Sequence, residues 1–250
     1  MTALALPTAR QEAWRYSDLE AVATVWPVPP AERISVAAGE SAVRIVAPQA
    51  GADGVVIADY AVDIAAGGTC AFFILNIAGR LGRIAIDVTL HDGAHFELGG
   101  AIVGGAGQTL EIVTTVNHVE PNATSNQVVR SVLAGTATGS FLGKVAVARD
   151  AQKTDASQSV KAMLLDRTAT ANAKPELEIF ADDVKCAHGA TVGELDRQAL
   201  FYLESRGLPP AEAKALLLQA FVAGAFVALE ADAARADLEA KALAALEALL

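Results

Sequence analysis

The chain has 250 residues and a formal net charge of −10, and 53% of its residues are hydrophobic although only 5% are aromatic. This length allows one large domain or a domain with an appendage, and the composition predicts a core of Ala, Val, Ile and Leu. The acidic charge argues against nucleic acids and anionic membranes as partners, because both are bound through a basic face.

Residues 1–30 predict an N-terminal helical segment followed by a linker. Thr8 and Gln11 have the spacing of a capping box, in which each side chain satisfies a backbone N–H at a helix start, so we expect a helix over 8–24. The prolines within 26–30 end any helix before them, since proline lacks the backbone N–H that a helix needs.

Residues 31–191 alternate apolar and polar side chains with the period of a β-strand, most clearly over 84–90, 110–116 and 141–147. Such strands predict an all-β sandwich, a barrel or a β-solenoid, and the lack of helical periodicity excludes a βαβ organisation. Small, β-branched interior side chains and Ala- and Gly-rich corners favour a parallel β-helix, which is a β-solenoid, over a sandwich or a barrel. We expect turns at 51–54, 67–68, 92–93, 99–100, 104–107, 121–122 and 135–136.

The stretch 174–209 predicts a change from strand to helix. An alternating strand places Leu177 and Ile179 on one side, Cys186 and His188 follow two residues apart, and Gly189 is expected to break the strand. Thr191 and Glu194 then have capping-box spacing, so we expect a helix to begin there.

Residues 192–250 predict a C-terminal helical domain. The first helix is expected to run from the Thr191 cap to Gly207, a second from Pro209 or Pro210 through Ala228, and a third from a cap at Asp232. The second helix is apolar almost all round, which indicates that it is central to a bundle or covered by a partner.

The pair Cys186-x-His188 is the strongest chemical signal in the chain. Residues i and i+2 of a strand share a face, so the sulfur and an imidazole nitrogen could reach one zinc ion, iron ion or iron–sulfur cluster. Two ligands cannot close a tetrahedral site, so the others would have to come from elsewhere, plausibly another chain. The alternative is a small buried cysteine beside a turn histidine.

Other polar residues give weaker signals. The glycine clusters do not form a phosphate-binding loop, so we expect no nucleotide to be bound by this chain. His91, His95 and His118 fall near predicted turns and are interpreted singly as surface residues, and the pair Asp182-Asp183 as a solvated turn.

The two cysteines, Cys70 and Cys186, do not form a disulfide framework. The first residues lack the basic start and apolar stretch of a secretory signal, and the longest apolar run, 216–229, is shorter than the roughly 20 residues of a membrane-spanning helix. We therefore expect a cytoplasmic protein with reduced thiols and no membrane association.

A series of motifs follows in a fixed order through the second half of the chain. They are FLGKV at 141–145, AQKTDASQ at 151–158, PELEI at 175–179, DVKCAHGAT at 183–191 and LFYLESRG at 200–207, with EAWRYSDL at 12–19 near the start. This series resembles the SufB/SufD family of the SUF iron–sulfur cluster assembly system. The resemblance is dense from residue 117 to 229, and the short, cysteine-poor chain is more similar to the SufD branch than to SufB.

The resemblance implies a right-handed parallel β-helix with a C-terminal helical domain. It also implies a non-enzymatic scaffold that pairs with SufB near the end of the β-helix and docks the ABC-type ATPase SufC on the helices. The docking positions expected there are Leu195, Tyr202, Leu217 and Phe221. The family's functional positions correspond to Cys186 and His188, which would contribute to a nascent cluster, or iron, shared between two subunits.

Three alternatives stay open at this point. The chain could be a SufB-like member that itself accepts sulfur on Cys70 or Cys186, or a stand-alone metal-binding enzyme. A homodimer of this chain is also compatible with the flat faces of solenoid coils. Whether a reduced flavin binds in the complex is a question that the sequence does not address.

Overall fold

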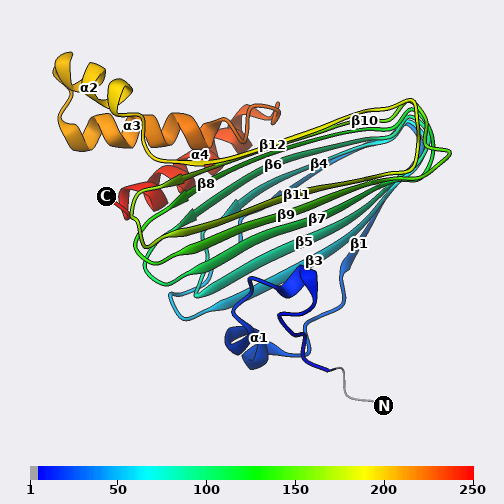
Figure 1. Cartoon of the computed structure of the whole chain (residues 1–250), viewed down its shortest axis with the longest axis horizontal. Helices are drawn as coiled ribbons and strands as arrows, with labels where there is room; N and C mark the ends of the chain where they lie inside the picture. Colours follow the sequence, from blue (N-terminus) through cyan, green and yellow to red (C-terminus); the bar gives the residue numbers. More distant parts are fainter. Residues whose placement is uncertain (1–4) are drawn as a thin grey trace.

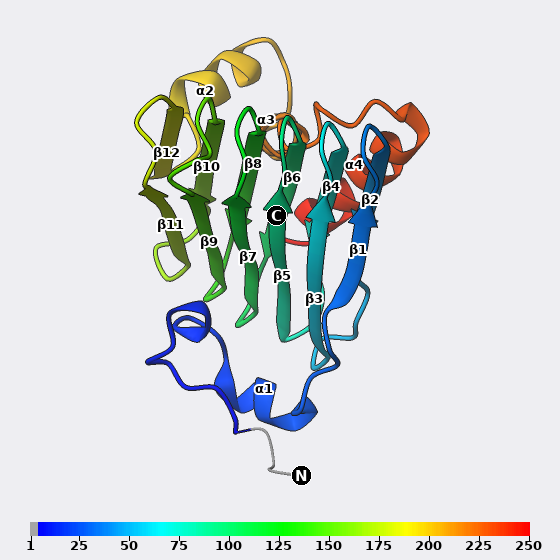
Figure 2. The same cartoon turned by 90° about the vertical axis from the view of Figure 1, so that its right-hand side faces the viewer.

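The computed structural model describes residues 5–250, so the first four residues of the predicted segment 1–30 lie outside it. Within that range two six-stranded parallel sheets face each other, and consecutive strands alternate between them (Figures 1 and 2). Sheet A holds β1 (Glu32–Val36), β3 (Val55–Ile64), β5 (Leu81–Leu90), β7 (Thr109–His118), β9 (Thr138–Val147) and β11 (Thr170–Ile179). Sheet B holds β2 (Ser41–Val46), β4 (Thr69–Asn76), β6 (His95–Gly104), β8 (Thr124–Leu133), β10 (Asp155–Leu164) and β12 (Lys185–Gly193). The predicted parallel β-helix is confirmed.

Stacked side chains fill the interior of the β-helix. Because neighbouring strands are parallel and in register, every inward residue lies directly over one in the next coil, as in the column Ile84, Ile112 and Phe141. Aromatic rings cluster near the N-terminal coils, where Phe72 packs between Tyr60 and Phe96 with centroid distances of 5.3 and 6.2 Å. Each coil buries its apolar face only against its neighbours, as expected of a solenoid.

One corner of the β-helix turns through a column of residues with positive φ. Each of these residues donates its N–H to a carbonyl in the next coil, for example Gly67 to Asp92 at 2.8 Å. Glycine and asparagine reach this left-handed backbone at little steric cost, which explains their recurrence at this corner. The column consists of Gly39, Gly67, Gly93, Asn122 and Lys153.

The turn predicted at 99–100 is wrong, because both glycines lie in the middle of β6. Gly99 faces the C-terminal helical layer, and a Cβ there would lie 2.1 Å from the carbonyl oxygen of Ala225. Gly100 faces the interior, where a Cβ would lie 2.9 Å from Ile112. These glycines therefore permit close packing on both faces of a strand rather than a change of direction.

The single helix predicted over 8–24 is wrong and is replaced by two short pieces, η1 (Glu12–Trp14) and α1 (Leu19–Val25). Gln11 does accept the Thr8 N–H, at 2.9 Å, which is half of the predicted capping box. The helix restarts because the Asp18 carboxylate accepts the Ala21 N–H at 3.0 Å and so acts as a new N-cap.

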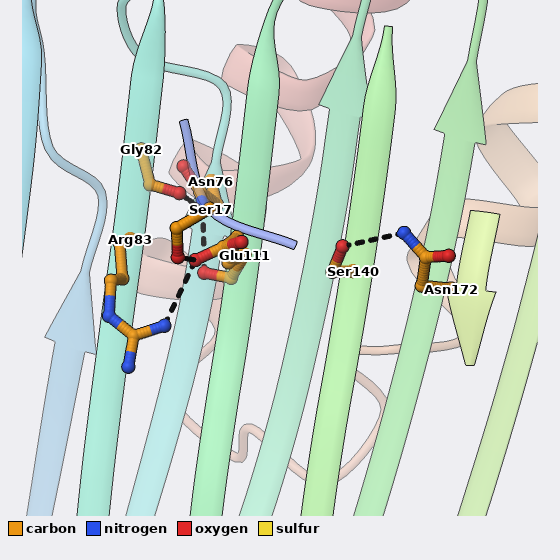
Figure 3. Close-up of polar contacts among 7 residues, drawn as sticks. All are labelled: Ser17, Asn76, Gly82, Arg83, Glu111, Ser140 and Asn172. Carbon is orange, nitrogen blue, oxygen red and sulfur yellow. Dashed lines mark hydrogen bonds and ion pairs between the residues drawn. The ribbon is translucent and has the colours of Figure 1, made fainter. Parts of the chain in front are cut away.

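The N-terminal segment 5–26 lies against the outer face of sheet A and covers a buried ion pair. Arg83 of β5 donates to Glu111 of β7 at 2.9 Å, and the two side chains are only 3% and 1% exposed. Ser17 donates to the same carboxylate at 2.7 Å (Figure 3), and the Trp14 ring lies 4.0 Å from the guanidinium. The segment is thus held to the sheet by charge, hydrogen bonding and aromatic packing together.

The polar column under this segment continues toward the last coil. Asn172 of β11 donates to Ser140 of β9 at 3.1 Å, and Ser140 is in register with Glu111 (Figure 3). Farther along β11, Lys174 forms an ion pair with Glu12. The N-terminal segment therefore contacts sheet A from β3, where Val55 and Ile57 pack against it, to the edge strand β11.

Three helices follow the β-helix: α2 (Arg197–Ser205), α3 (Pro210–Ala223) and α4 (Asp232–Glu247). The predicted start at Thr191 is wrong, because β12 continues past Gly189 to Gly193. Asp196 is the actual N-cap and accepts the N–H groups of Gln198 and Ala199 at 2.8 and 3.3 Å. The end of this helix is as predicted, with Gly207 at φ 91°.

The other two helix predictions hold in part. Pro210 does open α3, but the helix ends before Gly224 instead of continuing through Ala228. Asp232 is the first residue of α4 rather than its cap, and its carboxylate pairs with Arg235. Within residues 5–250 no helix has both the length and the apolar character needed to cross a membrane.

Helices α3 and α4 lie on the side of sheet B, opposite the N-terminal segment (Figure 1). Their inner side chains and the outward side chains of β4, β6 and β8 form a second apolar core. Phe226, in the connection after α3, is fully buried there beside Phe73 and Val103. The helical layer is therefore fixed to the β-helix by burial of apolar surface.

Candidate functional site

The last coil, formed by β11 and β12, lies at the edge of both sheets (Figure 2). No other strand of the described chain pairs with the free side of either, so their outer backbone N–H and C=O groups are available to another chain. Most residues of β12 are exposed, including Val192 at 49%. This coil is called the open end below.

Cys186 and His188 both lie in β12, at the open end. Cys186 pairs in register with Ala156 and His188 with Gln158, and both of these β10 residues point into the interior. Cys186 is half-buried against the interior core, whereas His188 is exposed. Residues i and i+2 of a strand lie roughly 6.6 Å apart at Cα and share a face, so the structure brings this predicted pair together.

The thiol of Cys186 is not activated by its surroundings. Partial burial raises the pKa of Cys186, the Ala156 backbone N–H opposes that shift, and the nearby Asp155 carboxylate adds to it. A raised pKa leaves the sulfur protonated at neutral pH, where it is a poor nucleophile and a poor ligand. A metal ion or a cationic group from a partner would be needed to form the thiolate.

The ligand set at the open end is incomplete. Across residues 5–250 no three His, Cys, Asp or Glu side chains converge on a point that could hold a metal ion. A tetrahedral site takes four ligands, so this chain offers at most part of one. Within the described residues, Cys186 and His188 are therefore a pair of side chains without further ligands.

Cys70 lies in a quite different environment. Its side chain is fully buried inside the β-helix, and burial raises its pKa to about 11. A buried, protonated thiol does not meet the needs of sulfur transfer, which requires an accessible thiolate.

The prediction that His118 lies on the surface is wrong. The side chain is completely buried in the interior, where Nε2 lies 3.0 Å from the Ser125 hydroxyl. The alternation of β7 puts His118 on the same inward face as Ile112 and Val116. Burial lowers its pKa to about 4, a shift that the Ala123 backbone only partly opposes. His91 and His95 are partly exposed, as expected for turn-proximal residues.

Buried His118 should make stability fall as pH drops from about 6.5 to 4. In this window the unfolded chain takes up a proton on this residue and the folded chain does not, so lowering the pH favours unfolding by up to about 3 kcal/mol. Urea unfolding at pH 7, 5.5 and 4.5 measures the loss, and His118→Gln should remove this part of it. Equal losses of unfolding free energy in the unaltered chain and in His118→Gln would contradict the lowered pKa of His118.

The four predicted docking positions differ in exposure. Tyr202 is 56% exposed, whereas Leu195 and Phe221 pack against the second core and Leu217 is partly buried. Three other apolar side chains, which the sequence analysis did not single out as docking positions, are also exposed. They are Phe201 at 72%, Leu216 at 46% and Val227 at 74%.

Gln158 is a further residue that the sequence analysis did not single out as part of the site. It lies next to His188 in register and is only 3% exposed. The available signal was its position in the alternation of 155–164, where a glutamine occupies an inward place between Ala156 and Val160.

Comparison with known proteins assigns the family. The family model described as "SUF system FeS cluster assembly, SufBD core domain" matches residues 32–221, well over half of the chain. The chain belongs to the SufBD family. The match includes all twelve strands of the β-helix, the Cys186–His188 pair, α2 and most of α3, so the predicted resemblance is confirmed.

Curated relatives from this family are similar to part of the chain. The chain is 38% identical over 110 residues to the iron–sulfur cluster assembly protein SufD of Escherichia coli and 32% identical over 132 residues to SufD of Bacillus subtilis. It is 35% identical over 148 residues to a SufBD family protein of Synechocystis. These stretches are 44%, 53% and 59% of this chain but only 26%, 30% and 33% of the relatives, so the chain spans about a third or less of their length.

Proposed function

We propose that this chain is a non-enzymatic scaffold subunit of an iron–sulfur cluster assembly complex. The observation that carries the proposal is a Cys-x-His pair, with Cys186 half-buried and His188 exposed, on an edge strand with one unpaired side, in a member of the SufBD family. In this function the nascent cluster is cargo, and Cys186 and His188 hold it or its iron together with groups from a second subunit.

The open end supports a SufB-type β-helix as the second subunit. Edge strands β11 and β12 present unpaired backbone groups, and a similar coil from a partner could continue both sheets. Such pairing would bring the partner's side chains beside Cys186 and His188. The ligands missing from this chain would then come from the partner.

The C-terminal helices support an ATPase of the SufC type as a further partner. Phe201 and Tyr202 lie exposed on α2, with Leu216 exposed on α3. Exposed aromatic side chains are frequent anchors of protein interfaces. Since α2 follows β12 directly, movement of a protein bound there could be transmitted to the open end.

A SufB-like subunit that accepts sulfur itself is the second candidate function. Burial and a pKa of about 11 make Cys70 unsuitable for that role, which leaves only Cys186. A persulfide on Cys186 after incubation with a cysteine desulfurase would favour this function over the scaffold.

Co-purification with SufB and SufC tests the scaffold directly. We expect a stable complex at micromolar concentrations and a mass in solution equal to the sum of its subunits. A homodimer is the expected competitor when this chain is alone, since its open end is self-complementary in backbone hydrogen bonding. Failure to bind either partner, or turnover by the isolated chain, would rule the scaffold out.

His188→Ala should leave folding intact and reduce cluster formation in the assembled complex by at least tenfold. The side chain is exposed, so its removal costs little stability, but a ligand is lost. Cluster loading is measured by absorbance and iron content after reconstitution. His91→Ala is the control, because His91 lies far from the open end in the β5–β6 corner. Equal loading of the two variants would remove His188 from the site.

A further inference from the structure

A line of polar side chains runs through the interior of the β-helix to the open end. Gln127, Gln158 and His188 pair in register on β8, β10 and β12, so they stand one above another on the inward face of sheet B. Gln127 and Gln158 are 0% and 3% exposed. The interior directly beneath His188 is therefore an amide rather than an apolar side chain.

The two glutamines differ in the residue of sheet A that faces them across the interior. Thr114 of sheet A donates to the Gln127 Oε1 at 2.7 Å. One coil on, the residue in register with Thr114 is Gly143, which has no side chain to offer. The Phe141 ring and the Gln158 amide occupy the space that this glycine leaves, since a Cβ on Gly143 would lie 2.4 Å from the ring and 2.6 Å from Nε2.

Neither amide atom of Gln158 has a hydrogen-bond partner among residues 5–250. A buried amide without partners destabilises a fold, and an apolar side chain of similar size would fill the place without that cost. An amide in this position indicates that its hydrogen bond forms in a functional state of the protein. His188 is the neighbouring side chain on the open side of Gln158, and its position in an edge strand leaves it free to turn.

We propose that Gln158 is a positioning residue for His188. Its Oε1 accepts one ring N–H of the imidazole, which fixes the tautomer and leaves the other ring nitrogen free to bind a metal ion. Histidine ligands of metal ions commonly donate their second N–H to such an acceptor. The metal-binding part of this inference rests on the proposed function, whereas the effect on the tautomer does not.

The test compares Gln158→Leu with the unaltered full-length chain by NMR of ¹⁵N-labelled histidine rings. We expect the tautomer ratio of His188 to change at least twofold, and the affinity of His188 for Zn²⁺ alone to fall at least tenfold. The melting temperature should change little, because the hydrogen bond that is lost joins Gln158 to an exposed side chain of an edge strand, and the leucine removes a buried polar group from the interior. Gln158→Met serves the same purpose if the leucine variant does not fold.

Gln127→Leu is the matched control, with the same residue type one coil farther from the open end. It should lower the melting temperature, because the Thr114 hydroxyl loses its acceptor, and leave His188 unchanged. An unchanged His188 tautomer in Gln158→Leu, or a lower melting temperature like that of the control, would overturn the inference. The two proposals can fail separately. If His188→Ala leaves cluster formation unchanged while Gln158→Leu still changes the His188 tautomer, the proposed function is contradicted and the positioning role of Gln158 is not.

Discussion

Glu111→Ala should destabilise this protein by about 3–5 kcal/mol, because it leaves the buried Arg83 guanidinium without its counter-charge. The carboxylate is the shared acceptor of Arg83 and Ser17, so its loss also removes one of the bonds that anchor the N-terminal segment to sheet A (Figure 3). The free energy of unfolding in urea measures the effect. A faster cleavage of the segment by protease should accompany it.

Two controls separate the buried charge from general effects of substitution. Glu178→Ala breaks the Lys144–Glu178 pair, whose side chains are 40% and 47% exposed, and should cost at most about 1 kcal/mol. The double variant Arg83→Met with Glu111→Leu should recover most of the loss, since it buries no unpaired charge. A loss in Glu111→Ala no larger than in Glu178→Ala would contradict the importance of the buried pair.

Much of the β-helix could be predicted from the sequence because its strands follow one rule. Side chains alternate in and out, and the alternation over 84–90, 110–116 and 141–147 lies within β5, β7 and β9. The same rule could have placed His118 inside, since it follows Ile112 and Val116 at even spacing. The period of the strand, and not proximity to a turn, determines that His118 is buried.

The boundaries of helices were harder to predict, because short-range signals compete. The Thr191–Glu194 spacing fits a capping box, but Thr191 forms part of β12 through pairing with Lys161 of β10. Strand pairing over the whole length of β12 outweighs one local cap, and Asp196 supplies the cap a few residues later. Long-range pairing of this kind is not visible in a local motif.

The arrangement at the open end could be predicted only in part. Spacing alone placed Cys186 and His188 on one face and showed that two ligands are too few for a tetrahedral site. The position of Gln158 beneath His188, with Gly143 near it in the interior, depends on the register between coils. The same holds for Arg83 and Glu111, which are 28 residues apart in the sequence and adjacent in sheet A.

Phe226→Ala should destabilise the protein by about 3–5 kcal/mol, because the ring is fully buried between the helical layer and sheet B. The backbone at this connection also approaches Gly99 closely, so it cannot collapse readily onto a smaller side chain. Urea unfolding and hydrogen exchange in α3 and α4 measure the loss. Exchange should increase in these helices before it increases in the β-strands.

Phe201→Ala is the matched control, for which we expect little change in stability and a loss of partner binding. Its ring is 72% exposed, so truncation should change stability by less than about 0.5 kcal/mol. If α2 is the docking surface for the ATPase, the same change should weaken binding at least tenfold, or about 1.4 kcal/mol, by calorimetry. Normal affinity in Phe201→Ala would exclude this surface, and equal stability of the two variants would show that the helical layer is not fixed through Phe226. A structural phenylalanine and an interface phenylalanine are thus separated by two measurements on the same pair of variants.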